Sequence, residues 1–272
     1  MPIHKTAIIE DGAIIDPTAE IGPYVVIGPN VKIGAGTKIG AHSVIDGHTT
    51  IGNDCKIYAS ASIGLDPQDI SYKGQPTGVS MGDRVTVREF VTVHRASKEG
   101  VTVVGDDCFL MAYSHVAHDD VLGKGVIMAN GATLAGHVTV GDHTVMAGVL
   151  IVHQFVRIGR LNMISGMTGT RLDLPPFAMC DGRPTRVRGV NIIGMRRQKM
   201  AAENRSAIKK AFRMIYRSDE NITQALERIE NEIHPYPEIV ELVDFYRTSK
   251  RGVTGKTAPD EDAEANFGDD TD

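Results

Sequence analysis

The stretch IDPTAEIGPYVVIGPNVKIGAGTKIG, residues 15–40, carries isoleucine at every sixth position. In the whole chain this series runs without a break from Ile3 to Ile63. The residue after the isoleucine is often glycine, and the residue four places on is small or β-branched, as at Ala19 and Val31. A period of six fits neither a helical face nor an alternating strand. The chain is therefore built from internal repeats.

A solenoid with three short strands per coil explains this period, because each six-residue unit then forms one side of a triangular coil of about 18 residues. The repeated aliphatic side chain points inward and stacks on its counterpart in the next coil. The pattern continues at Met81, Val87 and Val93, and then from Val104 to Ile164. We expect a mainly β fold, a parallel β-helix, over residues 1–190.

Two interruptions break the series. The polar, Gly- and Pro-bearing residues 65–79 read as a loop that leaves the coil. About five extra residues around 95–102 form a second bulge, because the step from Val93 to Val104 is eleven instead of six. Loops that leave a rigid scaffold commonly carry function.

The six-residue pattern stops at Pro175-Pro176, and helical spacing follows. Apolar residues at positions such as Ala207, Ala211 and Met214 predict three or four helices from about 191 to 248, within a small C-terminal domain over 191–251. Residues 252–272 are acidic and poor in apolar groups, so we expect a disordered tail.

Composition limits the class of protein. Apolar residues make up 42% of the chain but aromatic residues only 5%, and the net charge of -5 comes largely from the acidic tail. Three cysteines are too few for a disulfide framework or a thiolate metal site. The N-terminus lacks a signal-peptide pattern, and no run of 18 apolar residues occurs. We expect a cytoplasmic protein without an integral membrane segment.

Histidines recur on one side of the predicted coil. His118, His137 and His153 lie in the repeats that begin at residues 116, 134 and 152, which are one coil apart. If the five extra residues of the bulge are discounted, His94 joins them, and His115 lies beside them. Such residues could simply hydrogen-bond to their neighbours, could bind zinc, or could serve in acid–base catalysis.

Four segments of the chain resemble those of a known enzyme family: SHVAHDDVLG (114–123), NGATLAGHVTVGD (130–142), VHQF (152–155) and RGVNIIGMRR (188–197). They closely resemble UDP-N-acetylglucosamine O-acyltransferases, and the resemblance extends from residue 3 to about 251. It implies a left-handed coil. It also implies transfer of a (3R)-3-hydroxyacyl chain from acyl carrier protein to the sugar 3-hydroxyl of UDP-N-acetylglucosamine, the first step of lipid A biosynthesis.

The resemblance also implies catalytic roles. His118 matches the general base that takes the proton from the sugar hydroxyl, and imidazole titrates near neutral pH. Asp119 matches the carboxylate that supports this base. Gly136 matches the residue whose backbone N–H faces the oxyanion, where a donor stabilises charge that develops in the transition state.

Other positions match substrate contacts. The residues that correspond to positions around the sugar and acyl chain are Gln68, Asp69, His115, His137 and Gln154; we add His153 from the histidine series. His94, Asn191 and Arg197 match positions near the nucleotide and its phosphates. Gly166 matches the site that limits acyl length, and a glycine there should admit a long chain.

Two positions depart from the family pattern. Ser71 stands where the family usually has a lysine, and Ile193 stands where it usually has a glutamate. The nucleotide is then held differently, or the acceptor varies. A 3-amino acceptor sugar, which would give an amide, stays open.

Other functions stay open as well. The later N-acyltransferase of the same pathway carries an extra domain before its repeats, whereas here the repeats start at Ile3. A zinc-dependent carbonic anhydrase family uses the same scaffold with three histidines. A purely structural β-helix would need neither the histidines nor the helical end.

Partners and cofactors follow from the same resemblance. Residues 183–217 contain eleven Lys or Arg and one acid, Glu203, which suits an acidic carrier protein. The family forms homotrimers with the active site between subunits. We expect no metal, no nucleic acid and no resident cofactor, since the donor carries its own phosphopantetheine.

Overall fold

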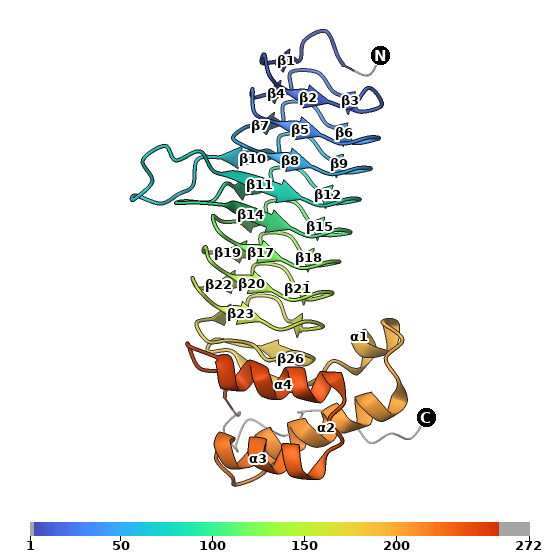
Figure 1. Cartoon of the computed structure of the whole chain (residues 1–272), viewed down its shortest axis with the longest axis vertical. Coiled ribbons are helices and arrows are strands. Elements are labelled where there is room, and N and C mark those ends of the chain that lie inside the picture. The colour runs from blue at the N-terminus through green and yellow to red at the C-terminus, as the bar shows by residue number, and fades with distance from the viewer. Residues whose placement is uncertain (1–2, 256–272) are drawn as a thin grey trace.

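The repeated aliphatic residue ends a two-residue strand and points into the coil. In the computed structural model, which describes residues 3–255, strand β5 (Lys32–Ile33) is typical, with Lys32 exposed and Ile33 buried. Three such strands, joined by tight turns, make one coil. The coils stack into a left-handed parallel β-helix with the helical domain at its C-terminal end (Figure 1).

The strands form three sheets, one on each side of the triangular coil. Sheet I contains β1 (Ile8–Ile9), β4 (Val26–Ile27), β7 (Val44–Ile45), β10 (Ser62–Leu65), β13 (Thr92–His94), β16 (His115–Val116), β19 (Thr133–Leu134), β22 (Ile151–Val152) and β25 (Gly169–Thr170). Sheet II contains β2 (Ile14–Ile15), β5, β8 (Thr50–Ile51), β11 (Gly78–Met81), β14 (Val101–Val104), β17 (Val121–Leu122), β20 (Thr139–Val140) and β23 (Arg157–Ile158).

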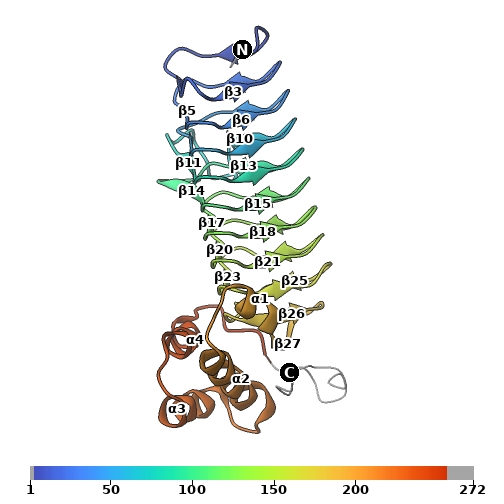
Figure 2. The same ribbon diagram turned by 90° about the vertical axis from the view of Figure 1, so that its right-hand side faces the viewer.

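Sheet III is drawn toward the viewer in Figure 2 and contains β3 (Glu20–Ile21), β6 (Lys38–Ile39), β9 (Lys56–Ile57), β12 (Thr86–Val87), β15 (Phe109–Leu110), β18 (Ile127–Met128), β21 (Val145–Met146), β24 (Met163–Ile164), β26 (Ala178–Asp181) and β27 (Arg186–Val190). Its last pair differs from the rest of the solenoid. Strands β26 and β27 are antiparallel, so the β-helix ends in a hairpin that leads into the helices.

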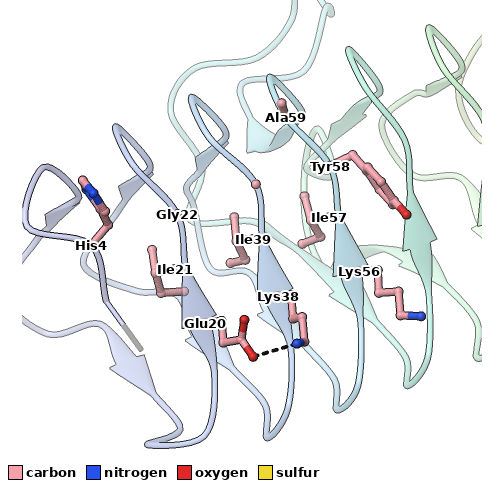
Figure 3. Close-up of a pocket in the computed structure, with 11 residues that line it drawn as sticks. His4, Glu20, Ile21, Gly22, Lys38, Ile39, Lys56, Ile57, Tyr58 and Ala59 are labelled. Atoms are coloured by element: carbon pink, nitrogen blue, oxygen red, sulfur yellow. Dashed lines mark ion pairs between the residues drawn. The ribbon is translucent and has the colours of Figure 1, made fainter. Parts of the chain in front are cut away.

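The register agrees with an 18-residue coil. Ile15 pairs with Ile33, and Ile33 pairs with Ile51. The same side chains form the core, as Figure 3 shows for Ile21, Ile39 and Ile57, each 3% exposed. The ion pair between Glu20 and Lys38 lies outside this stack and is exposed, so it contributes little to stability.

Both predicted interruptions are loops. The first occupies residues 66–77, between β10 and β11, and projects from one side of the coil (Figure 1). The second occupies residues 95–100, between β13 and β14. Because Val93 pairs with Val116, 23 residues away, the second loop adds five residues without shifting the register of the next coil.

Four helices follow the β-helix: α1 (Ile192–Arg197), α2 (Ala202–Arg217), α3 (Ile222–Glu232) and α4 (Pro237–Thr248). Asn221 begins α3 with a capping box completed by Gln224, and Pro237 opens α4, where its missing N–H costs no helical hydrogen bond. No helix within residues 3–255 is both long and apolar enough to cross a membrane.

The predicted tail starts too early. Residues 252–255 are not disordered, because Val253 bridges to Asp173 and the hydroxyl of Thr254 donates to the carbonyl of Thr185 at 2.6 Å. These contacts satisfy the backbone and bury Thr254 against the last coils. Residues 256–272, for which disorder is also predicted, lie outside the described residues.

A pair of isoleucines, one pointing into the coil and one pointing outward, tests the contribution of the core to stability. Ile45 is 0% exposed, whereas Ile14 is 60% exposed in the first coil. We expect Ile45→Ala to lower the free energy of unfolding by about 2–5 kcal/mol, because it leaves a cavity between stacked coils. Ile14→Ala should cost less than about 1 kcal/mol. Denaturant unfolding measures both, and equal losses would contradict the stacked core.

Candidate active site

Several candidate residues lie at the corner between sheets I and II, in the turns after β16, β19 and β22. His118, Gly136 and Gln154 occupy one turn position in successive coils, 18 residues apart. Asp119, His137 and Phe155 occupy the next position and form a second row. Backbone hydrogen bonds tie the turns together, since the N–H of His137 donates to the carbonyl of His118 at 3.1 Å.

The second row adopts an unusual backbone conformation. Asp119, His137 and Phe155 all have positive φ, at 62°, 54° and 65°. This left-handed region is unfavourable for residues with a Cβ, so the cross-coil hydrogen bonds must hold it. The turn aims both rows outward at the corner, and the ring of His137 stacks on Phe155 with centroids 4.6 Å apart.

His118 is fixed by its neighbour. Its Nδ1 lies 2.8 Å from Oδ2 of Asp119, and its side chain is 5% exposed. The same Oδ2 accepts hydrogen bonds from the Oγ of Ser97 at 2.7 Å and from the Ser97 N–H at 3.1 Å. Because an ionised carboxylate only accepts, the neutral form of the ring carries its hydrogen on Nδ1 and has Nε2 as its acceptor.

The carboxyl of Asp119 is held in its ionised form. Burial alone would raise its pKa, but hydrogen bonds from His118 and Ser97 outweigh this effect and hold the pKa below its ordinary value. The His118 ring therefore faces a stable negative charge on its Nδ1 side.

Gly136 leaves room beside the reactive nitrogen. A Cβ at this position would lie 2.9 Å from Nε2 of His118 and 2.8 Å from its Cε1. The φ of Gly136 is +99°, which a residue with a side chain adopts at a cost. Glycine therefore both permits the turn and keeps Nε2 open.

A buried carboxyl, Asp120, joins two of these turns. Its Oδ2 accepts from the N–H of Ala117 and its Oδ1 from the N–H of Val138, both at 2.8 Å. Complete burial raises its pKa to about 8, against the effect of these donors and of the Gly136 N–H. Asp120 thus holds His118 and Gly136 in adjacent coils at a fixed distance.

A cavity of about 400 Å³ opens above this corner. The loop 66–77 forms one of its walls, so five of the predicted site residues meet there. The residues that line it are Gln68, Asp69, Ile70, Ser71, Lys98, His118, His137, Gln154 and Phe155. The backbone N–H of Ser71 donates to Asp69 at 2.8 Å and lowers the pKa of that carboxyl.

His94 and His115 lie beside this cavity without lining it. Their rings meet edge to face with centroids 4.9 Å apart, and Nδ1 of His115 lies 2.7 Å from the hydroxyl of Thr92. Burial lowers the pKa of both imidazoles, that of His115 to about 4. Both are neutral at pH 7. Among the described residues, Nδ1 of His94 has no hydrogen-bond partner.

His153 faces a different space. It lines a cavity of about 780 Å³ toward the C-terminal coils, together with Arg171, Arg183 and Arg186. Its Nδ1 lies 3.3 Å from the guanidinium of Arg251. His94 ends a strand of sheet I, and the other three predicted histidines lie in the turns after strands of that sheet, but of the four only His118 and His137 face the same cavity.

Three predicted residues lie apart from His118 within one chain. Asn191 caps α1, accepts from the Gly194 N–H at 2.9 Å and donates to the Leu161 carbonyl at 2.8 Å. Arg197 is exposed at the end of α1, which projects from the opposite side of the coil to the loop 66–77 (Figure 1). Gly166 is exposed in the turn after β24.

Four residues of the site were not predicted from the sequence. Ser97 and Lys98 belong to the second loop, Asp120 follows the catalytic candidates, and Phe155 ends the VHQF segment. The five-residue insertion predicted that Ser97 and Lys98 lie in a loop, but it did not predict their contacts. Those contacts depend on which coil lies beneath the loop.

The same corner could accommodate a metal ion. His118, Asp119 and His137 each bring one ligand atom within 4.8 Å of the others. However, Oδ2 of Asp119 already accepts two hydrogen bonds from Ser97, and Nδ1 of His118 is used in the contact with Asp119. The arrangement suits a histidine held for proton transfer, because Asp119 fixes the ring through Nδ1 and leaves Nε2 open.

The sequence of this chain is similar to those of known proteins. Residues 173–254 match the family described as Udp N-acetylglucosamine O-acyltransferase, Domain 2, and residues 6–41 and 30–64 match the bacterial transferase hexapeptide family of six repeats. An acyl-[acyl-carrier-protein]–UDP-N-acetylglucosamine O-acyltransferase of an Anaeromyxobacter species is 44% identical over 93% of this chain and all of the relative. The enzyme of that name from a Synechocystis species is 49% identical over 68% of each chain.

The fold of this chain is also similar to those of solved structures. The UDP-N-acetylglucosamine O-acyltransferase of Moraxella catarrhalis superposes with a TM-score of 0.90 at 38% identity, over 93% of this chain and 100% of that one. The UDP-N-acetylglucosamine acyltransferase of Francisella novicida gives a TM-score of 0.91 at 32% identity, over 95% of each chain. Because identity and fold agree across nearly the whole length, this chain belongs to the UDP-N-acetylglucosamine O-acyltransferase family.

Proposed function

We propose that the chain transfers a (3R)-3-hydroxyacyl group from acyl carrier protein to the 3-hydroxyl of UDP-N-acetylglucosamine, the first step of lipid A biosynthesis, with His118 as the general base. Family membership supports the reaction. The observation that carries the role of His118 is its geometry: Asp119 holds Nδ1, and Nε2 is left open beside a glycine.

In this mechanism Nε2 of His118 accepts the proton of the sugar 3-hydroxyl as the oxygen attacks the thioester carbonyl. The imidazolium that forms is stabilised by Asp119, whose charge lies 2.8 Å from Nδ1. Ser97 keeps this carboxylate in place through two hydrogen bonds. Collapse of the tetrahedral intermediate releases the pantetheine thiolate, which takes the proton back from Nε2.

The oxyanion of the intermediate needs a donor, and Gly136 is our candidate. Its backbone N–H also acts on the Asp120 carboxyl, so the two acceptors would share it. Gln68, Asp69, His137 and Gln154 line the same cavity and are proposed to bind the sugar and the start of the acyl chain. We propose that His115 and His153 also contact the sugar or the acyl chain, and that His94 lies near the nucleotide. We propose that Gly166 limits the length of the acyl chain.

The separation of Asn191 and Arg197 from His118 supports a homotrimer. In one chain, α1 projects from the opposite side of the coil to the loop 66–77, which lines the His118 cavity (Figure 1). A nucleotide in that cavity would reach Arg197, at the end of α1, if a second copy supplied this helix. Nine of the eleven basic residues of 183–217 lie on β27, α1 and α2 at the C-terminal end, where we propose that acyl carrier protein docks.

Replacement of the base gives the first test of mechanism. We expect His118→Ala to lower kcat about 10²- to 10⁴-fold with an unchanged melting temperature, because the hydroxyl then loses its proton acceptor. Transfer from 3-hydroxyacyl carrier protein to UDP-N-acetylglucosamine measures the effect. Undiminished transfer would rule out His118 as the base.

A pair of glycines tests the space beside Nε2. We expect Gly136→Ala to reduce kcat at least tenfold, because its methyl group would crowd Nε2 and strain the turn. Gly125→Ala is the matched control, since Gly125 also has positive φ and its Cβ would meet the ring of His143, 2.5 Å from Nδ1, away from the site. Both variants should lose stability, and only the first should lose catalysis. Equal activity losses would contradict the assignment.

The acceptor and the metal alternative are tested on the wild-type enzyme. With the 3-hydroxyl sugar and its 3-amino analogue side by side, we expect ester formation to be the faster reaction, as the names of the relatives indicate. Faster amide formation would overturn this choice.

The cluster of His118, Asp119 and His137 motivates a zinc determination, and stoichiometric zinc with carbonic anhydrase activity would favour the metal-dependent function.

A further inference from the structure

We propose that Lys98 binds the diphosphate of the nucleotide-sugar acceptor. This inference rests on the proposed function and adds to it a residue on the second loop, 95–100. It starts from the lining of the His118 cavity, in which Lys98 is the one lysine or arginine side chain among the described residues.

The backbone of Lys98 is placed by its neighbour. Ser97 is 1% exposed, and both its N–H and its hydroxyl donate to Asp119. On the preceding residue, the carbonyl of Ala96 accepts from the hydroxyl of Thr77, so the first loop and the second loop are joined there. Lys98 therefore begins one residue from the support of the catalytic pair, and its flexible side chain extends along the cavity wall.

Other cations near the cavity are already used or lie outside it. The guanidinium of Arg95 donates to the carbonyl of Gly64 and to the hydroxyl of Tyr72, both at 3.0 Å, and pairs with Asp66. Lys73 does not line the cavity, and its Nζ lies 3.5 Å from the carbonyl of Ile70. Within residues 3–255, Lys98 forms no ion pair, so its ammonium is available to a ligand.

The charge balance of the cavity calls for such a cation. Asp69 lines it, and Asp119 lies behind His118, so one carboxylate faces the acceptor and a second lies one side chain away. A diphosphate bound one sugar ring away from the reacting hydroxyl would be repelled unless a positive charge offsets them. Ser71, on the opposite loop, lines the cavity without a charge. A lysine suits this task as a compact point charge on a flexible stem.

The experiment separates binding from chemistry. For Lys98→Ala we expect KM and the calorimetric Kd for UDP-N-acetylglucosamine to rise about tenfold, with kcat changed less than threefold, because a charge-assisted contact to the ground-state phosphate is lost. The dependence of KM on ionic strength should also weaken. Lys73→Ala is the matched control and should resemble the wild type.

Rescue provides the second arm. In the Lys98→Ala background, Ser71→Lys places a charge on the opposite wall of the same cavity and should recover at least half of the lost affinity. If Lys98→Ala leaves KM and Kd within twofold of the wild type, the inference about Lys98 is wrong while the proposed function stands. If the wild type itself neither binds UDP-N-acetylglucosamine nor acylates it, the proposed acceptor and the inference about Lys98 fail together.

Discussion

The stacking of one aliphatic side chain on its counterpart 18 residues away is the contact on which the rest of the structure depends. It buries Ile27, Ile45 and Ile63 completely in one sheet and repeats in the other two. Each coil has only six inward-facing strand and turn positions, so it cannot bury enough apolar surface alone. The low aromatic content follows from the narrow interior, which accepts isoleucine and valine in layers more readily than large rings.

The same stacking fixes the positions of the turn residues at each corner closely enough for chemistry. Since every coil repeats the geometry of the one before it, turn residues 18 apart come to lie over one another. His118 over Gly136, and Asp119 over His137, are consequences of this repetition. The unfavourable positive φ of three residues at this corner is tolerated because backbone hydrogen bonds from adjacent coils hold the turns. A rigid turn can then fix an imidazole within hydrogen-bonding distance of its carboxylate.

The two loops convert a regular corner into a site. Without them, the corner would be an exposed row of polar residues, like the other edges of the solenoid. The loop 66–77 provides a wall with Gln68 and Asp69, and the loop 95–100 provides Ser97, which donates to Asp119, and Lys98, which lines the cavity. Neither loop disturbs the core, because the strands on both sides keep the register of the coil. Function is thereby added without cost to the stacked interior.

The sequence by itself determined the solenoid, its interruptions and the helical end. A strict period of six predicts a three-sided coil, and the motifs around His118 indicate the family and, through it, the left hand of the coil. The sequence also predicted that the histidine-bearing repeats share a face. Only the tertiary structure decided which histidines face the same cavity. His137 lies one turn position after His118 and shares its cavity, whereas His153 lies one position before and faces a separate cavity near Arg251.

Ser97 and Asp120 likewise reach residues 22 and 18 positions away, Asp119 and Val138, through contacts that no local pattern encodes. The tail gives the converse case, because its composition predicts disorder from residue 252, whereas burial against the last coils orders residues 252–255. Repetition makes backbone position predictable from sequence. Side-chain partnership depends on the neighbouring coil and is settled only when the coils stack.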